Sequence, residues 1–98
     1  GSGPAYFFYM AEALRDAAVK LGIKNEHALK LAVETLVGSG ALLETLGAQP
    51  NVLRQRITSK KGTTEAALRV LDSKRFSHIF AKAVEAAARQ AKDLSKGA

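Results

Sequence analysis

The segment from Asn25 to Leu46 is apolar around much of its circumference when it is drawn as a helix. A helix of this kind has to be buried on most sides. A chain of 98 residues offers too few other helices to cover it alone. The sequence therefore predicts that this helix is covered partly by a second chain. Gly38-Ser39-Gly40 in its middle predicts either a kink or a point where another helix crosses closely.

Helical periodicity continues through the rest of the chain, and no alternating strand pattern occurs. Pro4 fits the first position of a helix that stops at Gly22. Asn25 is the predicted N-cap of the next helix, which ends at Gly47. Three more helices are predicted, from Pro50 to about Ile57, from about Thr63 to Leu71, and from Phe76 to Leu94, with residues 95–98 frayed. The predicted fold is a single all-α domain of about five helices over residues 1–98.

The same periodicity predicts which residues face a core. They are Phe7, Met10, Ala11, Leu14, Ala17, Ala18 and Leu21 in the first helix, Ala67, Leu68 and Leu71 in the fourth, and Phe76, Ile79, Phe80, Ala83, Val84, Ala87, Ala91 and Leu94 in the last. Apolar residues make up 47% of the chain, but many are alanine, which buries little area per residue. This composition suits a helical protein that gains burial by forming oligomers.

Several classes of site are excluded or disfavoured. The absence of cysteine excludes disulfides and cysteine-based metal sites or nucleophiles. His27 and His78 have no companions at metal-ligand spacing, so we expect structural or surface roles and no metal. The carboxylates lie scattered over helix faces, and neither a GxGxxG nor a Walker motif is present. No apolar run of membrane-spanning length and no signal-peptide layout occurs, so we expect a cytoplasmic protein that does not bind membranes.

The stretch from Pro50 to Asp72 places hydroxyls, ammonium groups and a glycine where a helix begins. The first N–H groups of a helix lack partners and carry partial positive charge, so they bind carboxylates or phosphates. Gly62 allows a ligand to approach the backbone closely, and the Thr64 hydroxyl can donate or accept a hydrogen bond. Threonine or serine at this place can also serve only as a helix cap. The residues by themselves leave both interpretations open.

At these residues the sequence resembles the C-terminal domain of pyrroline-5-carboxylate reductase, the last enzyme of proline biosynthesis. The segment Ile57 to Thr64 reads ITSKKGTT and is similar to the family's V-T-S-P-G-G-T-T. Further matches lie at Gly1 to Tyr6, similar to SGSGPAY, at Glu12 to Gly22, similar to EALxDAAVKLG, and at Phe76 and Ala83 to Ala86, similar to GFRxxxxxAVEAA. Together these motifs cover essentially the whole chain in the family's order.

The chain departs from the family pattern at two places. Lys60-Lys61 stand where the family usually has Pro-Gly. Gln55 and Arg56 stand where it often has an aspartate or asparagine. Both changes add positive charge beside a site that the resemblance assigns to a carboxylate substrate, so they are compatible with binding.

The resemblance implies a helical domain that interleaves with its partner in a homodimer, which some members assemble into decamers. It implies reduction of 1-pyrroline-5-carboxylate to proline with NADP or NAD as cofactor. The cofactor would be bound by an N-terminal dinucleotide-binding domain that is absent from these residues. We therefore expect the chain to be a piece of the enzyme, cut at the domain boundary and inactive as a reductase alone.

The resemblance also implies roles for individual residues. The backbone N–H groups of Gly62, Thr63 and Thr64, with the Ser59 hydroxyl, would bind the substrate carboxylate. The hydroxyl of Thr64 would hydrogen-bond the ring nitrogen and align the imine, which makes Thr64 the predicted catalytic residue. The two lysines before Gly62 are not part of the family pattern, and from their charge alone we expect them to raise the local concentration of anions without direct contact.

Two alternatives come from other functional classes. The net charge of +6 and a basic turn between two helices superficially resemble a helix-turn-helix DNA-binding protein. The helix after the turn offers only Glu65 and Arg69 as exposed polar side chains, which is a poor set for contacting base edges. The other alternative is a dimerisation module that binds no ligand.

Overall fold

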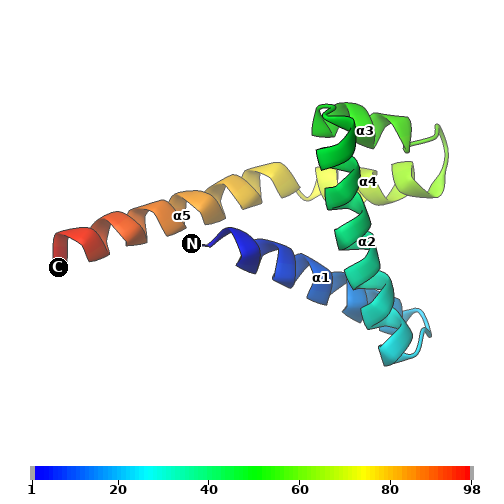
Figure 1. Ribbon diagram of the computed structural model, residues 1–98, viewed down its shortest axis with the longest axis horizontal. Coiled ribbons are helices and arrows are strands. Elements are labelled where there is room, and N and C mark those ends of the chain that lie inside the picture. Colours follow the sequence, from blue (N-terminus) through cyan, green and yellow to red (C-terminus); the bar gives the residue numbers. More distant parts are fainter. Residues whose placement is uncertain (1, 98) are drawn as a thin grey trace. The chain divides into compact units, whose positions relative to one another are not determined.

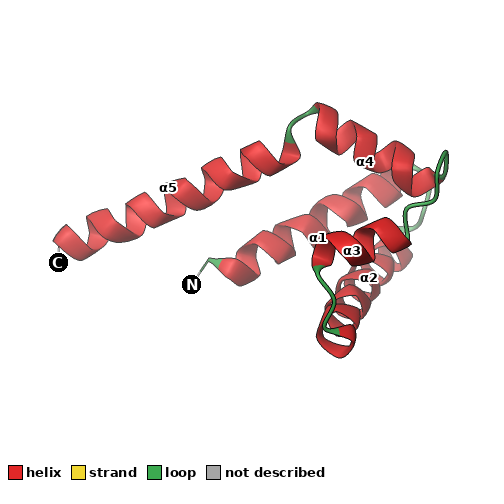
Figure 2. Cartoon of the chain, turned by 90° about the horizontal axis from the view of Figure 1, so that it is seen from above, coloured by secondary structure: helices red, strands yellow, loops and turns green. Residues whose placement is uncertain are grey.

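The computed structural model describes residues 2–97, and this part of the chain forms five helices and no strand (Figures 1 and 2). They are α1 (Gly3–Lys20), α2 (Asn25–Leu46), α3 (Pro50–Arg56), α4 (Thr63–Ser73) and α5 (Phe76–Gly97). The helices fall into two compact units, Gly1–Pro50 and Asn51–Ala98. The predicted all-α class with about five helices is confirmed.

In the first unit α1 and α2 form a helical hairpin around a core of alanines. Ala18 of α1 and Ala28 and Ala32 of α2 are the buried apolar residues, the last two almost completely. Their small side chains allow the two helix backbones to approach closely. The turn between the helices depends on Gly22, whose φ of 101° is unfavourable for any residue with a Cβ. Its geometry explains why α1 stops where the sequence predicts.

The start of α2 differs from the prediction by one residue. The N-cap is Lys24, whose carbonyl accepts the first helical hydrogen bond from the Ala28 N–H at 2.9 Å. Asn25 is already helical, so its assignment as the N-cap was wrong. No side chain caps this end. The other end follows the prediction, since Gly47 adopts a left-handed conformation with φ of 59° and its N–H bonds to the Leu43 carbonyl.

The glycine pair in α2 neither breaks the helix nor meets a neighbour. The helix runs without interruption through Gly38 and Gly40, and the Ser39 hydroxyl donates to the Thr35 carbonyl at 2.7 Å. A Cβ added to either glycine would meet nothing within 4 Å among the described residues. Within the first unit, no other helix crosses α2 closely at this point.

The C-terminal half of α2 is apolar and largely uncovered. Val37, Leu42 and Leu46 are 65%, 55% and 53% exposed, respectively. Exposing so much of a helix to water sacrifices most of the stabilisation that its leucines and valines can supply. The predicted need for a partner is therefore visible in the structure of the first unit.

The second unit contains α3, α4 and the long α5. The Thr58 hydroxyl closes α3 by donating to the Arg54 carbonyl at 2.5 Å. The helix α4 continues two residues beyond its predicted end at Leu71, so the break before α5 comprises only Lys74 and Arg75. Arg75 turns the chain with a φ of 58°.

Two predictions for this unit were wrong. The helix α5 continues to Gly97, so residues 95–97 are helical rather than frayed, and Ala98 lies outside the described residues. The predicted core is also not buried: Ala67 and Leu71 are exposed, and Leu68 is half-buried. Along α5 only Phe80 and Ala87 are even half-buried among the described residues. These apolar stripes lie on helix faces that stay largely uncovered within the second unit.

We expect the chain to form dimers in solution, because the exposed faces of α2 and α5 lose contact with water only against another surface. Light scattering should give the mass of two chains. The melting temperature should rise with protein concentration, as it does when association and folding are linked. A folded monomer at all concentrations would contradict this expectation.

Substitution Ala28→Leu should destabilise the hairpin by about 1–3 kcal/mol, because three extra carbon atoms do not fit at a fully buried crossing. Thermal unfolding followed by circular dichroism at fixed concentration measures the effect. Ala13→Leu is the matched control. Ala13 is exposed beside Glu12 in α1, so the same change there should alter stability by no more than about 0.5 kcal/mol. Equal effects at both positions would show that the hairpin is not packed through Ala28.

Candidate anion site at the start of α4

The predicted site residues come together in the segment that joins α3 to α4. Ser59 lies in the loop, Gly62 is the N-cap of α4, and Thr63 and Thr64 are its first two residues. Thr64 is half-buried, whereas Ser59 and Thr63 are exposed. The structure thus gathers all four residues at one helix start.

Gly62 permits a close approach within this loop. Its backbone is extended, with φ of −88° and ψ of 179°, so any residue could adopt its conformation. The requirement for glycine is one of space. A Cβ at this position would overlap the Ser59 hydroxyl and lie 3.1 Å from the Ser59 carbonyl oxygen. The Ser59 side chain therefore lies directly against the Gly62 backbone.

The donors available at the helix start differ by one from the predicted set. The Gly62 N–H already donates to the Ser59 carbonyl at 3.0 Å. The first bond of the α4 ladder is from the Ala66 N–H to the Gly62 carbonyl, which leaves the N–H groups of Thr63, Thr64 and Glu65 without helical partners. Sequence reasoning missed Glu65. Counting the unpaired N–H groups of a helix that starts at Thr63 would have identified it.

The side chain of Glu65 does not block these donors. Its carboxylate pairs with the Arg69 guanidinium one turn further along α4, at 2.8 Å. This pairing directs the negative charge towards the second turn of the helix. The partial positive charge at the helix start therefore remains open to an external anion.

Lys61 lies in a left-handed turn, at the position where the family pattern usually has glycine. Its φ of 61° lies in the left-handed region, which glycine adopts readily and other residues adopt at a cost. The residue directly before Gly62 therefore has a left-handed backbone conformation, although it is lysine and not the family's usual glycine. The lysine at this position therefore has local backbone strain.

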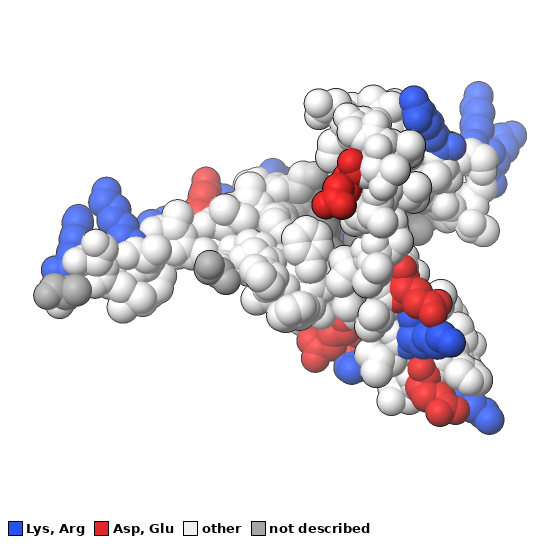
Figure 3. All heavy atoms as spheres, in the orientation of Figure 1, with Lys and Arg blue, Asp and Glu red and all other residues white. Residues whose placement is uncertain are grey.

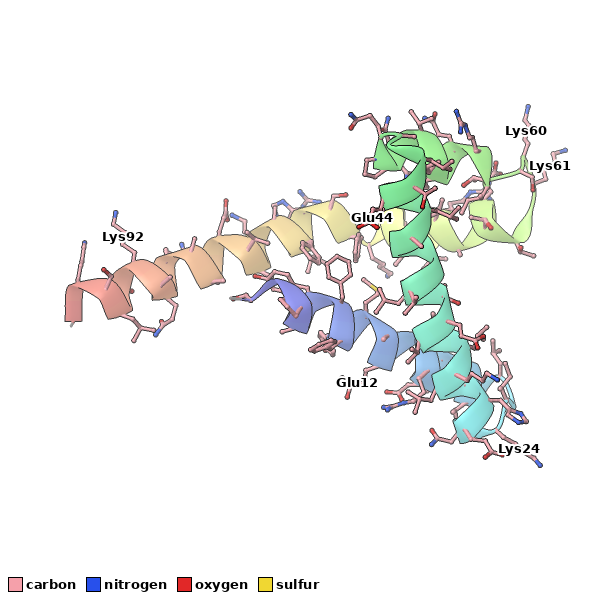
Figure 4. All side chains as sticks on the ribbon, in the orientation of Figure 1. Glu12, Lys24, Glu44, Lys60, Lys61 and Lys92 are labelled. Carbon is pink, nitrogen blue, oxygen red and sulfur yellow. The ribbon has the colours of Figure 1, made fainter. Side chains whose placement is uncertain are left out.

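The loop and the end of α3 carry a cationic cluster, which we define as Arg54, Arg56, Lys60 and Lys61. Figure 3 shows basic side chains at this end of the second unit, and Figure 4 shows the two lysines pointing outward from the loop. All four are exposed, and none takes part in an ion pair with the residues that the structure describes. The positive charges of these four side chains are therefore not neutralised by ion pairs with the described residues.

A shallow hollow of about 450 Å³ lies in the same unit, beside the loop. It is lined by Arg54, Thr58, Glu65, Leu68, Arg69 and Asp72. Ser59, Gly62, Thr63 and Thr64 are not among the residues that line it.

Other kinds of site find no support within residues 2–97. No group of three histidine or acidic side chains there is placed to hold a metal ion. No single helix in this range is both long and apolar enough to cross a membrane.

Comparison with known proteins identifies the family. Residues 1–94 match the family described as "Pyrroline-5-carboxylate reductase dimerisation". The chain belongs to this family. Among curated relatives, it is 38% identical over 96 residues to a pyrroline-5-carboxylate reductase of Pseudomonas aeruginosa and 41% identical over 96 residues to one of Arabidopsis thaliana. These alignments cover 98% of the chain and 35% of each relative, so the chain spans about a third of the length of these reductases.

Solved structures agree with the family assignment. A pyrroline-5-carboxylate reductase from Coxiella burnetii superposes with a TM-score of 0.91 and 42% identity, over 96% of this chain and 35% of that one. The enzyme from Plasmodium falciparum, crystallised with NADP bound, superposes with a TM-score of 0.88 and 33% identity, over 92% and 34%. The two reductase structures share the helical architecture described above.

The strand, glycine-rich turn and helix that commonly bind dinucleotides are not found in the described residues. Residues 2–97 contain no strand, and the sequence has no GxGxxG.

Substitution Lys61→Gly should raise the stability of the domain by about 0.5–1 kcal/mol, because glycine removes the left-handed strain at some cost in chain entropy. Chemical denaturation measures the change. The control is Lys60→Gly, next to it but outside the left-handed region, where the entropy cost alone should lower stability by up to about 1 kcal/mol. If both glycines acted alike, the left-handed turn at Lys61 would be refuted.

Proposed function

We propose that the chain is the dimerising and substrate-binding domain of an enzyme that reduces 1-pyrroline-5-carboxylate to L-proline. The observation that carries this proposal is the family match over residues 1–94. The open donors at the start of α4 support it, since the substrate is a small carboxylate. In the proposed enzyme a nicotinamide, NADPH or NADH, bound outside these helices supplies the hydride.

The substrate carboxylate would be bound by backbone groups at the helix start. The free N–H groups of Thr63, Thr64 and Glu65 point out of the first turn of α4, and the Ser59 hydroxyl lies beside them at Gly62. Such bonds to a charged acceptor are stronger than those between neutral groups. Gly62 has no side chain to obstruct the approach of the anion, and its own N–H stays bonded to the Ser59 carbonyl.

The Thr64 hydroxyl would orient the reacting end of the substrate. Hydride addition to the imine carbon converts the C=N bond to C–N, and the ring nitrogen takes up a proton. A hydroxyl that hydrogen-bonds this nitrogen holds the imine plane in one orientation. Thr64 suits the task, because a half-buried, β-branched side chain has few rotamers. Positioning of this kind supplies rate without a strong acid or base.

The apolar faces of α2 and α5 would form the homodimer. Their exposure in a single chain supports an interface that covers both. Dimers of this type could assemble further into decamers. The isolated helical domain should have no reductase activity, since it has no place for the hydride donor.

Substitution Thr64→Ala in the full-length enzyme tests the assigned role. We expect kcat/KM for 1-pyrroline-5-carboxylate to fall about 10- to 100-fold, which is the loss of one hydrogen bond to a reacting group. The KM for the nicotinamide cofactor should not change. Steady-state kinetics with each substrate varied in turn give both values.

Two variants serve as controls. Thr64→Ser keeps the hydroxyl and should retain most of the activity. Thr63→Ala removes a neighbouring hydroxyl that is exposed, and it should leave kcat nearly unaltered. Wild-type kinetics in Thr64→Ala would remove Thr64 from the mechanism.

A further inference from the structure

The charged side chains in the segment before α4 are all positive. From Ala48 to Thr64 the sequence contains the four members of the cationic cluster and no carboxylate. The first acidic residue after it is Glu65, which Arg69 neutralises at 2.8 Å. The chain segment that leads into α4 therefore carries only positive side-chain charges, and the acidic groups nearest to it are Glu65, paired with Arg69, and Asp72 in the hollow beside the loop.

The two lysine side chains extend from the loop in positions from which their charges can attract an anion without contacting it. Lys60 and Lys61 are exposed, point away from the helices and form no ion pair with the described residues (Figure 4). Side chains that extend into solvent from a loop tip rarely hold a ligand in one pose. They do create a field that increases the encounter rate with an opposite charge.

Substrate and product of the proposed reaction differ in net charge. An imine nitrogen is a weak base, so 1-pyrroline-5-carboxylate carries its carboxylate charge alone at mildly alkaline pH. Reduction turns this nitrogen into a secondary amine, which is protonated under the same conditions. Proline is then a zwitterion with no net charge. A positive field attracts the first molecule and has little effect on the second.

We propose that Lys60 and Lys61 steer the anionic substrate to the start of α4 and do not retain the zwitterionic product. This inference rests on the proposed function and adds a selective role for two residues that lie outside the binding contacts. Glycine would be less strained than Lys61 in the left-handed turn. The attraction of the substrate by the two positive charges is a reason for a lysine there.

Coulomb's law sets the size of the effect. Two unit charges about 10 Å from an anion in water change its local concentration about four-fold. Salt weakens this attraction, because the Debye length falls from about 10 Å at 0.1 M to about 3 Å at 1 M ionic strength. Reversing both charges should double the change in free energy and give roughly a ten-fold loss.

The test uses the full-length enzyme with Lys60→Gln/Lys61→Gln and Lys60→Glu/Lys61→Glu. At low ionic strength, kcat/KM for 1-pyrroline-5-carboxylate should fall about two- to four-fold in the first variant and about ten-fold in the second. Both losses should disappear near 1 M salt. The inhibition constant of proline and the KM of the nicotinamide cofactor should stay within about two-fold of wild type.

Matched variants separate steering from other effects of substitution. Lys60→Arg/Lys61→Arg keeps the charges and should keep wild-type values. Lys92→Gln/Lys96→Gln lowers the net charge equally, in α5 rather than in the loop, and should leave kcat/KM unchanged (Figure 4). Salt-independent losses, an equal loss in the α5 variant, or a larger change for the cofactor than for the imino acid would each overturn the proposal.

The test also distinguishes failure of this inference from failure of the proposed function. A wild-type enzyme that does not reduce 1-pyrroline-5-carboxylate refutes the proposed function and the steering with it. An active enzyme whose kcat/KM is insensitive to both lysine variants refutes steering alone.

Discussion

Apolar surface that one chain cannot bury governs the structure of this domain. Its buried core consists of Ala18, Ala28 and Ala32, which hold the α1–α2 hairpin together but remove little area from water. The leucines and valines in the second half of α2 remain exposed, and so does the stripe along α5. The helices are therefore specified by their own sequence, and the apolar faces that they leave exposed agree with a family that is named for dimerisation.

The candidate site depends far less on burial than on backbone geometry. Its donors are the first N–H groups of α4, and they are positioned by the N-cap at Gly62 and the left-handed turn at Lys61. The Glu65–Arg69 pair keeps the nearest negative charge in the next turn of the helix. A site made in this way needs few particular side chains, so the proposed site is compatible with two lysines that the family does not usually have.

Sequence reasoning located most helix ends within one or two residues and the end of α5 within three, because glycines and periodic apolar residues mark helix ends and faces. It failed where the deciding contact is local geometry. Asn25 was taken for an N-cap, yet the Lys24 carbonyl begins the helix. The Gly62 N–H was expected to face a ligand, yet the Ser59 carbonyl accepts it. Leu71 was expected inside, but a helix face alone does not reveal what covers it.

The sequence by itself determined the all-α class, the ends of most helices, the family and the four residues at the α4 start. These properties follow from residue order, since propensity, periodicity and motif are local. Only the tertiary structure showed that Gly62 is needed for space against Ser59, that Lys61 keeps a left-handed turn, and that Glu65 supplies the third free N–H group. Those facts depend on where atoms of neighbouring turns lie in space, which no residue pattern specifies.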